Sequence, residues 1–199
     1  MKKLFTLLLS LFSTGLFAQI ETPAGSPTFE VSGQIALADV SVTYSRPSAK
    51  GRKVFGDLVP FGELWRTGAN AATKFSITGE MEFEGYLVPA GEYALYTIPG
   101  EKFWTVIISK NTSWWGVDGY DQSQDLMRFD VPAKSTSSHY ETFTISFSDF
   151  TNQSANLNLK WEKTKITIHM VMEVDQVVMA QIQEKLIDNA DPEPADQGR

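Results

Sequence analysis

An alternation of apolar and polar residues with a period of two recurs along most of the chain and limits the possible folds more than any other feature. In one segment Val40, Val42 and Tyr44 face one way, with small polar residues between them. Successive side chains of a β-strand point to opposite faces, so this pattern predicts strands with one buried face. The alternation recurs in KFSIT (74–78), LMRFDV (126–131), FTISF (143–147), NLNLKW (156–161) and KITIHMVME (165–173).

Two further segments are apolar on both faces: YALYTIP (93–99) and FWTVIIS (103–109). The PGEK turn between them predicts a hairpin near the centre of a sheet. Turn residues recur about every 8–12 residues, and strands do not alternate with helices. We therefore predict an all-β fold, an antiparallel, jelly-roll-like β-sandwich of about 8–10 strands with one short C-terminal α-helix.

The predicted helix covers residues 174–190, where the spacing of the apolar residues changes. Val174, Val178 and Ile182 recur at helical spacing and, with Val177 and Leu186, form one apolar stripe. We expect this stripe to pack against the sandwich. The alternative is that the helix docks onto a partner protein.

The N-terminus has the features of a secretory signal peptide. Lys2 and Lys3 precede an apolar run that is too short to span a bilayer, and the expected cut lies near Ala18 and Gln19. We therefore expect a soluble protein that is periplasmic or secreted and has no transmembrane segment. The predicted organisation is a signal peptide (1–18), a flexible lead-in (19–28), a β-sandwich domain (29–173), the helix (174–190) and a disordered tail (191–199).

The composition excludes several functional classes. Cysteine is absent, which rules out disulfides, thiolate nucleophiles and zinc–thiolate or iron–sulfur sites. The formal net charge of −7 argues against a nucleic-acid partner, whose phosphates need Lys and Arg. The two histidines, His139 and His169, have no spaced ligand on the same element, and no phosphate-binding glycine motif occurs. We therefore predict no metal site and no cofactor.

Residues 44–74 depart from the strand-and-turn pattern. They include six of the 17 Lys and Arg residues, and their glycines and prolines set an irregular path. In a structural interpretation, the arginines bind backbone carbonyls and carboxylates while apolar residues plug one end of the sandwich. In a functional interpretation, the arginines present forked donors to a carboxylate, sulfate or phosphate. The candidate binding residues are Arg46, Arg52, Trp65, Arg66 and Asn70.

A second irregular segment, residues 111–125, places aromatic residues beside carboxylates. Trp115 and Tyr120 would stack on sugar rings while neighbouring acids and amides bind the hydroxyls. Alternatively, the tryptophans fold back as a hydrophobic plug. Glycoside hydrolysis uses a pair of carboxylates. The candidates for such a pair are Glu63, Glu92, Asp118, Asp121 and Asp125.

Several longer motifs point to a known family. The most specific is RPSAKGRKVFGDLVPFGELWRTGANAATKF, which begins at Arg46, and it is followed by VPAGEYALYTIPG (88–100), WTVIIS (104–109), Trp115-Gly116, DLMRFDV (125–131), ETFTISF (141–147) and LKWEKTKI (159–166). Over roughly residues 26–172 the chain resembles the domain of unknown function 2911 family, exported proteins of Gram-negative bacteria. The resemblance implies a compact all-β domain behind a signal peptide. It implies no catalytic residue, because the family defines none.

Three hypotheses about function remain. The first is a non-enzymatic, exported β-sandwich of the cell envelope that binds a glycan or a small anion through the candidate residues of the two irregular segments. The second is an envelope glycoside hydrolase that uses a carboxylate pair. The third is a structural or protein-interaction module whose protein partner is unknown.

Overall fold

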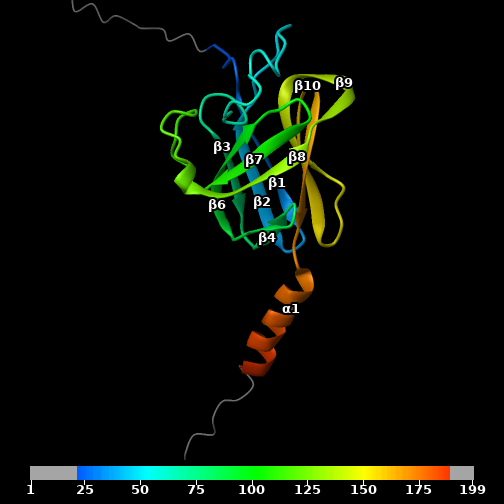
Figure 1. The fold of residues 1–199 in the computed structure, drawn as a ribbon. Coiled ribbons are helices and arrows are strands. Elements are labelled where there is room, and N and C mark those ends of the chain that lie inside the picture. Colours follow the sequence, from blue (N-terminus) through cyan, green and yellow to red (C-terminus); the bar gives the residue numbers. More distant parts are fainter. Residues whose placement is uncertain (1–21, 189–199) are drawn as a thin grey trace, which may run out of the picture.

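The computed structural model describes residues 22–188 and confirms the all-β prediction (Figure 1). In these residues the chain forms two antiparallel sheets, a larger one with the order β1-β2-β3-β6-β7-β8 and a smaller one with the order β5-β4-β10-β9. The predicted signal peptide (1–18) and tail (191–199) lie outside the described residues. The elements are β1 (Thr28–Ile35), β2 (Ala38–Ser45), β3 (Thr73–Ile77), β4 (Met81–Phe83), β5 (Tyr86–Val88), β6 (Gly91–Ile98), β7 (Phe103–Ser109), η1 (Gln122–Gln124), β8 (Asp125–Pro132), β9 (Lys134–Ser148), β10 (Ser154–Val171), α1 (Val174–Ile182) and η2 (Gln183–Asp188).

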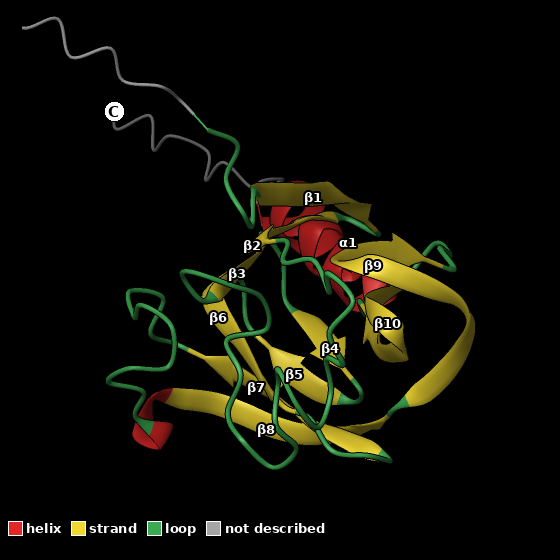
Figure 2. Ribbon diagram, turned by 90° about the horizontal axis from the view of Figure 1, so that it is seen from above, coloured by secondary structure: helices red, strands yellow, loops and turns green. Residues whose placement is uncertain are grey.

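The alternating apolar residues meet across the strands and form the core between the sheets. Val42 of β2 lies opposite Phe75 of β3, and Val40 lies opposite Ile77. All four side chains are buried, and burial of apolar surface of this kind stabilises a fold by roughly 25 cal/mol per Å². Figure 2 shows that the larger sheet curls from β1 round to β8, while β9 and β10 close the open side.

Strand β10 turns back on itself, so that its two halves lie side by side. Asn158 Oδ1 accepts a hydrogen bond from Thr167 Oγ1 (3.0 Å), and His169 Nδ1 lies 2.9 Å from Asn156 Oδ1. Glu162, between the halves, has a φ of 50°, in the left-handed region that tight turns use. The two halves are the segments NLNLKW and KITIHMVME that the sequence predicts as separate strands.

The long segment between β2 and β3 closes one end of the sandwich and is joined to both sheets. Its first part pairs with β9, because Ala49 N donates a hydrogen bond to Glu141 O (2.8 Å). Its later part pairs with β6 through a bridge between Trp65 and Thr97. The segment therefore spans the two sheets at the end of the domain that lies uppermost in Figure 1.

The expectation that the C-terminal helix packs on the sandwich is wrong beyond its first turn. Val174 and Val177 contact the core, but no residue of α1 is buried. The helix leaves the lower end of the domain (Figure 1), and Leu186 of the predicted stripe is 67% exposed. Helical spacing shows only that one face is apolar, not what covers that face.

No helix within residues 22–188 combines the length and apolar character needed to cross a membrane.

Deletion of residues 178–199 should leave the domain folded. We expect the free energy of unfolding to change by less than about 1 kcal/mol, because the deletion keeps both valines of α1 that touch the core. Urea denaturation followed by tryptophan fluorescence measures this. In the same assay Trp161→Ala, at a fully buried position, should cost about 3–5 kcal/mol. A deletion that cost as much as this substitution would show that the helix belongs to the core.

Candidate functional site

Trp65 anchors the segment that closes the sandwich. Its backbone exchanges two hydrogen bonds with Thr97 of β6, at 2.7 and 2.9 Å, and its Nε1 donates to Gly68 O at 3.0 Å. Its ring stacks on Trp161, with centroids 5.9 Å apart, and meets the edge of Phe143 at 5.0 Å. Both of these rings belong to the smaller sheet. The hydrophobic plug of the structural interpretation is therefore present, with Trp65 at its centre.

Arg46 fastens the start of the segment to β9. Its Nε donates to Phe143 O (3.2 Å), and its Nη2 donates to the hydroxyls of Thr142 (3.2 Å) and Thr144 (3.0 Å). The guanidinium carbon also lies 4.7 Å from the ring centroid of Phe29, a cation–π contact. Most of the hydrogen-bonding capacity of Arg46 therefore serves the fold.

Arg52 and Arg66 are held by backbone carbonyls on one side only. Arg52 donates from Nε to Ala49 O and from Nη2 to Ser48 O, both at 2.9 Å. Arg66 donates from Nη1 to Asn70 O at 2.9 Å. A guanidinium carries five N–H donors. Nη1 of Arg52 and both Nε and Nη2 of Arg66 therefore make no hydrogen bond to residues 22–188.

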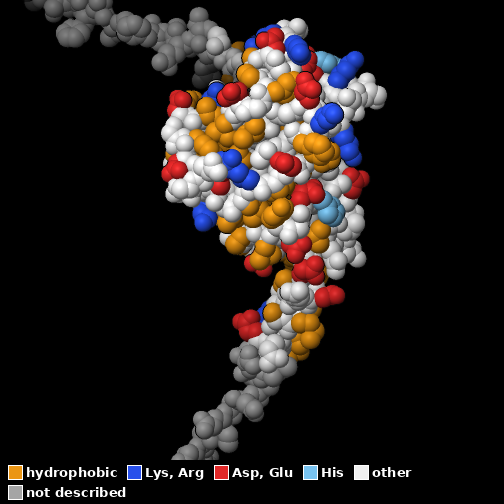
Figure 3. Space-filling view, in the orientation of Figure 1, with side chains coloured by type: hydrophobic (Ala, Val, Ile, Leu, Met, Phe, Trp, Pro, Cys, Tyr) orange, Lys and Arg blue, Asp and Glu red, His pale blue; other side chains and the backbone are white. Residues whose placement is uncertain are grey.

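Three adjoining hollows lie at this end of the domain, with volumes of about 380 Å³ (the central hollow), 430 Å³ (the middle hollow) and 550 Å³ (the outer hollow). Each falls in the range of roughly 300–1,000 Å³ that small-molecule sites occupy. Figure 3 shows hydrophobic side chains on the face of the domain over the region of β3 and β7, and Lys and Arg side chains among those near the upper end. The lining residues include Arg52, Trp65, Arg66 and Trp161 in the central hollow, Lys50, Arg52 and Asn70 in the middle hollow, and Arg46 and Lys50 in the outer hollow.

The structure brings five of the seven candidate binding residues to this run of hollows: Arg46, Arg52, Trp65, Arg66 and Asn70. Trp115 lies at its border, because the adjacent Gly116 packs so closely on Arg66 that a Cβ there would lie 2.8 Å from Nη1. The Trp115 side chain is 66% exposed, and Val117 lines the central hollow. The second irregular segment therefore meets the first beside Arg66.

Tyr120, the seventh candidate, lies in a separate cluster above β6 and β7. Its Oη donates to the carboxylate of Asp125 (2.7 Å), and Arg128 donates to both groups, from Nε to Asp125 (2.6 Å) and from Nη2 to Tyr120 (2.5 Å). Its ring contacts Tyr96 and Trp114 at 5.2 and 5.5 Å. Burial, followed by the neighbouring Asp125 carboxylate, raises the pKa of Tyr120 far above its usual value. Trp114 thus folds back as a plug, whereas its neighbour Trp115 stays exposed.

The carboxylates proposed for hydrolysis do not meet in one hollow. Asp125 is held in the Tyr120 cluster, and Asp121 caps η1. Glu63 lines the central hollow, while Glu92 lines a different hollow on the sheet. The central hollow therefore contains one carboxylate rather than a facing pair. In the described part of the chain, no group of three His, Asp or Glu residues is placed to hold a metal ion.

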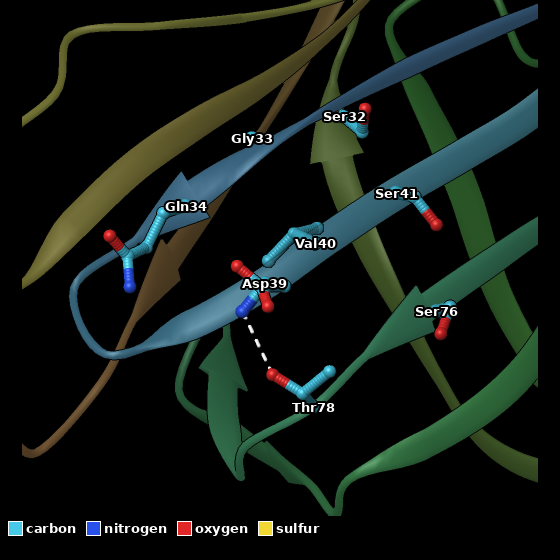
Figure 4. A pocket seen from close by; sticks show the side chains of 8 residues that line it. All are labelled: Ser32, Gly33, Gln34, Asp39, Val40, Ser41, Ser76 and Thr78. Atoms are coloured by element: carbon cyan, nitrogen blue, oxygen red, sulfur yellow. Dashed lines mark hydrogen bonds between the residues drawn. The ribbon is translucent and has the colours of Figure 1, made fainter.

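A further hollow of about 360 Å³ lies on the outer face of the larger sheet and is polar (Figure 4). Ser32, Ser41 and Ser76 come from three neighbouring strands at the same register. Thr78 Oγ1 accepts a hydrogen bond from Asp39 N at 2.8 Å. Its lining contains no aromatic ring and no cation. We therefore place the candidate site at the end closed by Trp65.

Several residues that line the hollows are not among the binding residues predicted from the sequence; they include Lys50, Leu58, Val117 and Trp161. Lys50 and Leu58 lie in the basic segment, where position alone does not separate a lining residue from an exposed one. Val117 reaches the hollow only because the two irregular segments meet. The alternation in its strand predicts that Trp161 belongs to the core, and its side chain is indeed only 2% exposed. Trp161 nevertheless also lines the central hollow.

Stability should fall as the pH rises above about 10, the ordinary tyrosine pKa. Burial raises the pKa of Tyr44, Tyr93, Tyr96 and Tyr120 in the fold. Above the ordinary value the unfolded chain loses these protons while the folded chain keeps them, so the unfolded state is favoured. Urea denaturation at a series of pH values measures this, and Tyr120→Phe should make the decline shallower. An unchanged slope in that variant would contradict the assignment of the shift to Tyr120.

Comparison with known protein families confirms the family resemblance that the sequence motifs indicate. The family described as a protein of unknown function (DUF2911) matches residues 26–170, a span that contains both sheets and the segment around Trp65. No curated protein and no solved structure matches the chain. Because the matched span covers well over half of the sequence, the chain belongs to the DUF2911 family.

Proposed function

We propose that this protein is a non-enzymatic binding domain of the cell envelope, and that the central hollow holds a ligand with an anionic group, such as an acidic sugar or a small organic anion. One observation carries the proposal. Arg52 and Arg66 both line a hollow of about 380 Å³ and are fixed by backbone carbonyls, yet both keep unpaired donors. Trp65 and Trp161 supply aromatic surface in the same hollow.

The fixed arginines favour binding for a physical reason. A free arginine side chain loses rotamer freedom when it binds a ligand, and each such side chain costs about 0.5–1.5 kcal/mol. The hydrogen bonds from Arg52 to Ser48 O and from Arg66 to Asn70 O restrict the guanidiniums before any ligand arrives. Hydrogen bonds between such groups and a carboxylate are worth about 1.5–3 kcal/mol each.

Export is part of the proposal and is supported by the N-terminal sequence. The lysines and the short apolar run are those of a signal peptide with a cut near Ala18 and Gln19. A ligand of the envelope or of the medium is consistent with that location. The alternative of a protein-interaction module would use the exposed stripe of α1, which lies at the opposite end of the domain (Figure 1).

Thermal unfolding with a panel of small ligands tests the proposal. Glucuronate, galacturonate and sulfate are compared with glucose, each at rising concentration. A ligand at 100 times its dissociation constant adds about 2.7 kcal/mol, which raises the melting temperature of a domain of this size by roughly 5–10 °C. We expect such a rise for at least one anion and none for glucose.

The variant Arg66→Gln should abolish the rise while lowering the melting temperature of the free protein only slightly, because Arg66 makes one hydrogen bond within the fold. Lys53→Gln is the matched control: it removes a cation of the same segment that lines none of the three hollows. The proposal fails if no anion stabilises the protein, or if the two variants respond alike.

A further inference from the structure

The three hollows adjoin one another in a row, which we call the track. The central and middle hollows share Ser26, Pro47 and Arg52 as lining residues. The middle and outer hollows share Gly25, Ser48 and Lys50, among others. The central and outer hollows share no lining residue, so the middle hollow lies between them and a long ligand would cross all three.

Cations follow this track from end to end in an otherwise acidic protein. Arg66 and Arg52 line the central hollow, Lys50 joins Arg52 in the middle hollow, and Arg46 joins Lys50 in the outer hollow. Glu63 is the one acidic residue among the lining residues of the three, although the whole chain has a net charge of −7. A hollow lined by one sign of charge concentrates ligands of the opposite sign.

The groups on the track that have no partner include both charged and neutral ones. The Lys50 ammonium and Nη1 of Arg46 have no hydrogen-bond or ion-pair partner among residues 22–188, and neither have the Ser48 hydroxyl and the side-chain Oδ1 of Asn70. The cations suit carboxylates, and the hydroxyl and amide suit alcohol groups. A chain of acidic sugars carries carboxylates and hydroxyls on every unit, whereas an acidic peptide or DNA does not repeat hydroxyls in this way.

We propose that the ligand is a strand of acidic polysaccharide, a polymer of uronic acid type, that lies across all three hollows. This inference rests on the proposed function and extends it: the central hollow seats one unit, and the middle and outer hollows seat the units that follow. A small anion would need the central hollow alone. The two ideas therefore differ in how the affinity depends on ligand length.

Calorimetric titration of the purified protein with galacturonate, its dimer and its hexamer tests the inference, with maltohexaose as a neutral hexamer. We expect the hexamer of galacturonate to bind at least about tenfold more tightly than the monomer, a difference in affinity that titration resolves readily. Maltohexaose should not bind, and higher salt should weaken the acidic hexamer more than the monomer because screening acts on every charge pair.

The variant Lys50→Gln distinguishes the contribution of the middle and outer hollows from that of the central hollow, because Lys50 lines only the first two. In this variant the hexamer should lose most of its advantage in affinity over the monomer, while the affinity for monomeric galacturonate should stay unchanged. Arg66→Gln should weaken both ligands, and Lys53→Gln should change neither. The Lys50 side chain is exposed and unpaired, so its loss should not disturb the fold.

The outcomes distinguish the inference from the proposed function. If galacturonate binds through Arg66 but the hexamer binds no more tightly, the polysaccharide inference is wrong and the proposed function stands. If neither monomer nor hexamer binds, the inference falls, and the small-ligand panel above decides the proposed function separately. A hexanucleotide that bound more tightly than the galacturonate hexamer, or a Lys50→Gln variant that behaved like Lys53→Gln, would also overturn the inference.

Discussion

The burial of Trp65 between the two sheets is the constraint on which the rest of this end of the molecule depends. Its ring packs on Phe143 and Trp161 of the smaller sheet, while its backbone pairs with Thr97 of the larger sheet. One residue thus ties a long irregular segment to both layers. A large aromatic side chain buries about 150–250 Å², so the apolar contacts of Trp65 offset part of the entropy lost when the segment becomes ordered.

Because this segment is fixed, its arginines are fixed as well. Arg52 and Arg66 hydrogen-bond to carbonyls of their own segment, as the structural interpretation expects, and both line the hollow with donors that make no hydrogen bond to residues 22–188. The structural and functional interpretations of the basic segment are therefore compatible. The bonds that hold a guanidinium in place also prepare its remaining donors for a ligand. Arg46 differs, since three of its hydrogen bonds go to β9.

The strands could be predicted from the sequence because the alternation of apolar and polar residues within a short segment already shows which side chains will be buried. Val42 and Phe75, for example, both follow this pattern and lie opposite each other in the sheet. The surroundings of individual residues could not be predicted in this way. The residues around Tyr120 in the sequence do not show whether its ring stacks on a sugar or its hydroxyl bonds to a carboxylate. Its partner Arg128 lies in the strand that follows. The meeting of Gly116 with Arg66 is a long-range contact that no local pattern encodes. The same holds for α1, whose apolar spacing was visible and whose exposure was not.

The contacts of Trp65 imply that the segment around it is fully formed before any ligand arrives. Amide hydrogen exchange of the free protein, measured by NMR at Trp65 and Thr97, tests this claim directly, because these two amides hydrogen-bond to each other's carbonyls. We predict that both exchange slowly, with an opening free energy close to that of the core strands. Rapid exchange at Trp65, as in a mobile loop, would contradict the claim.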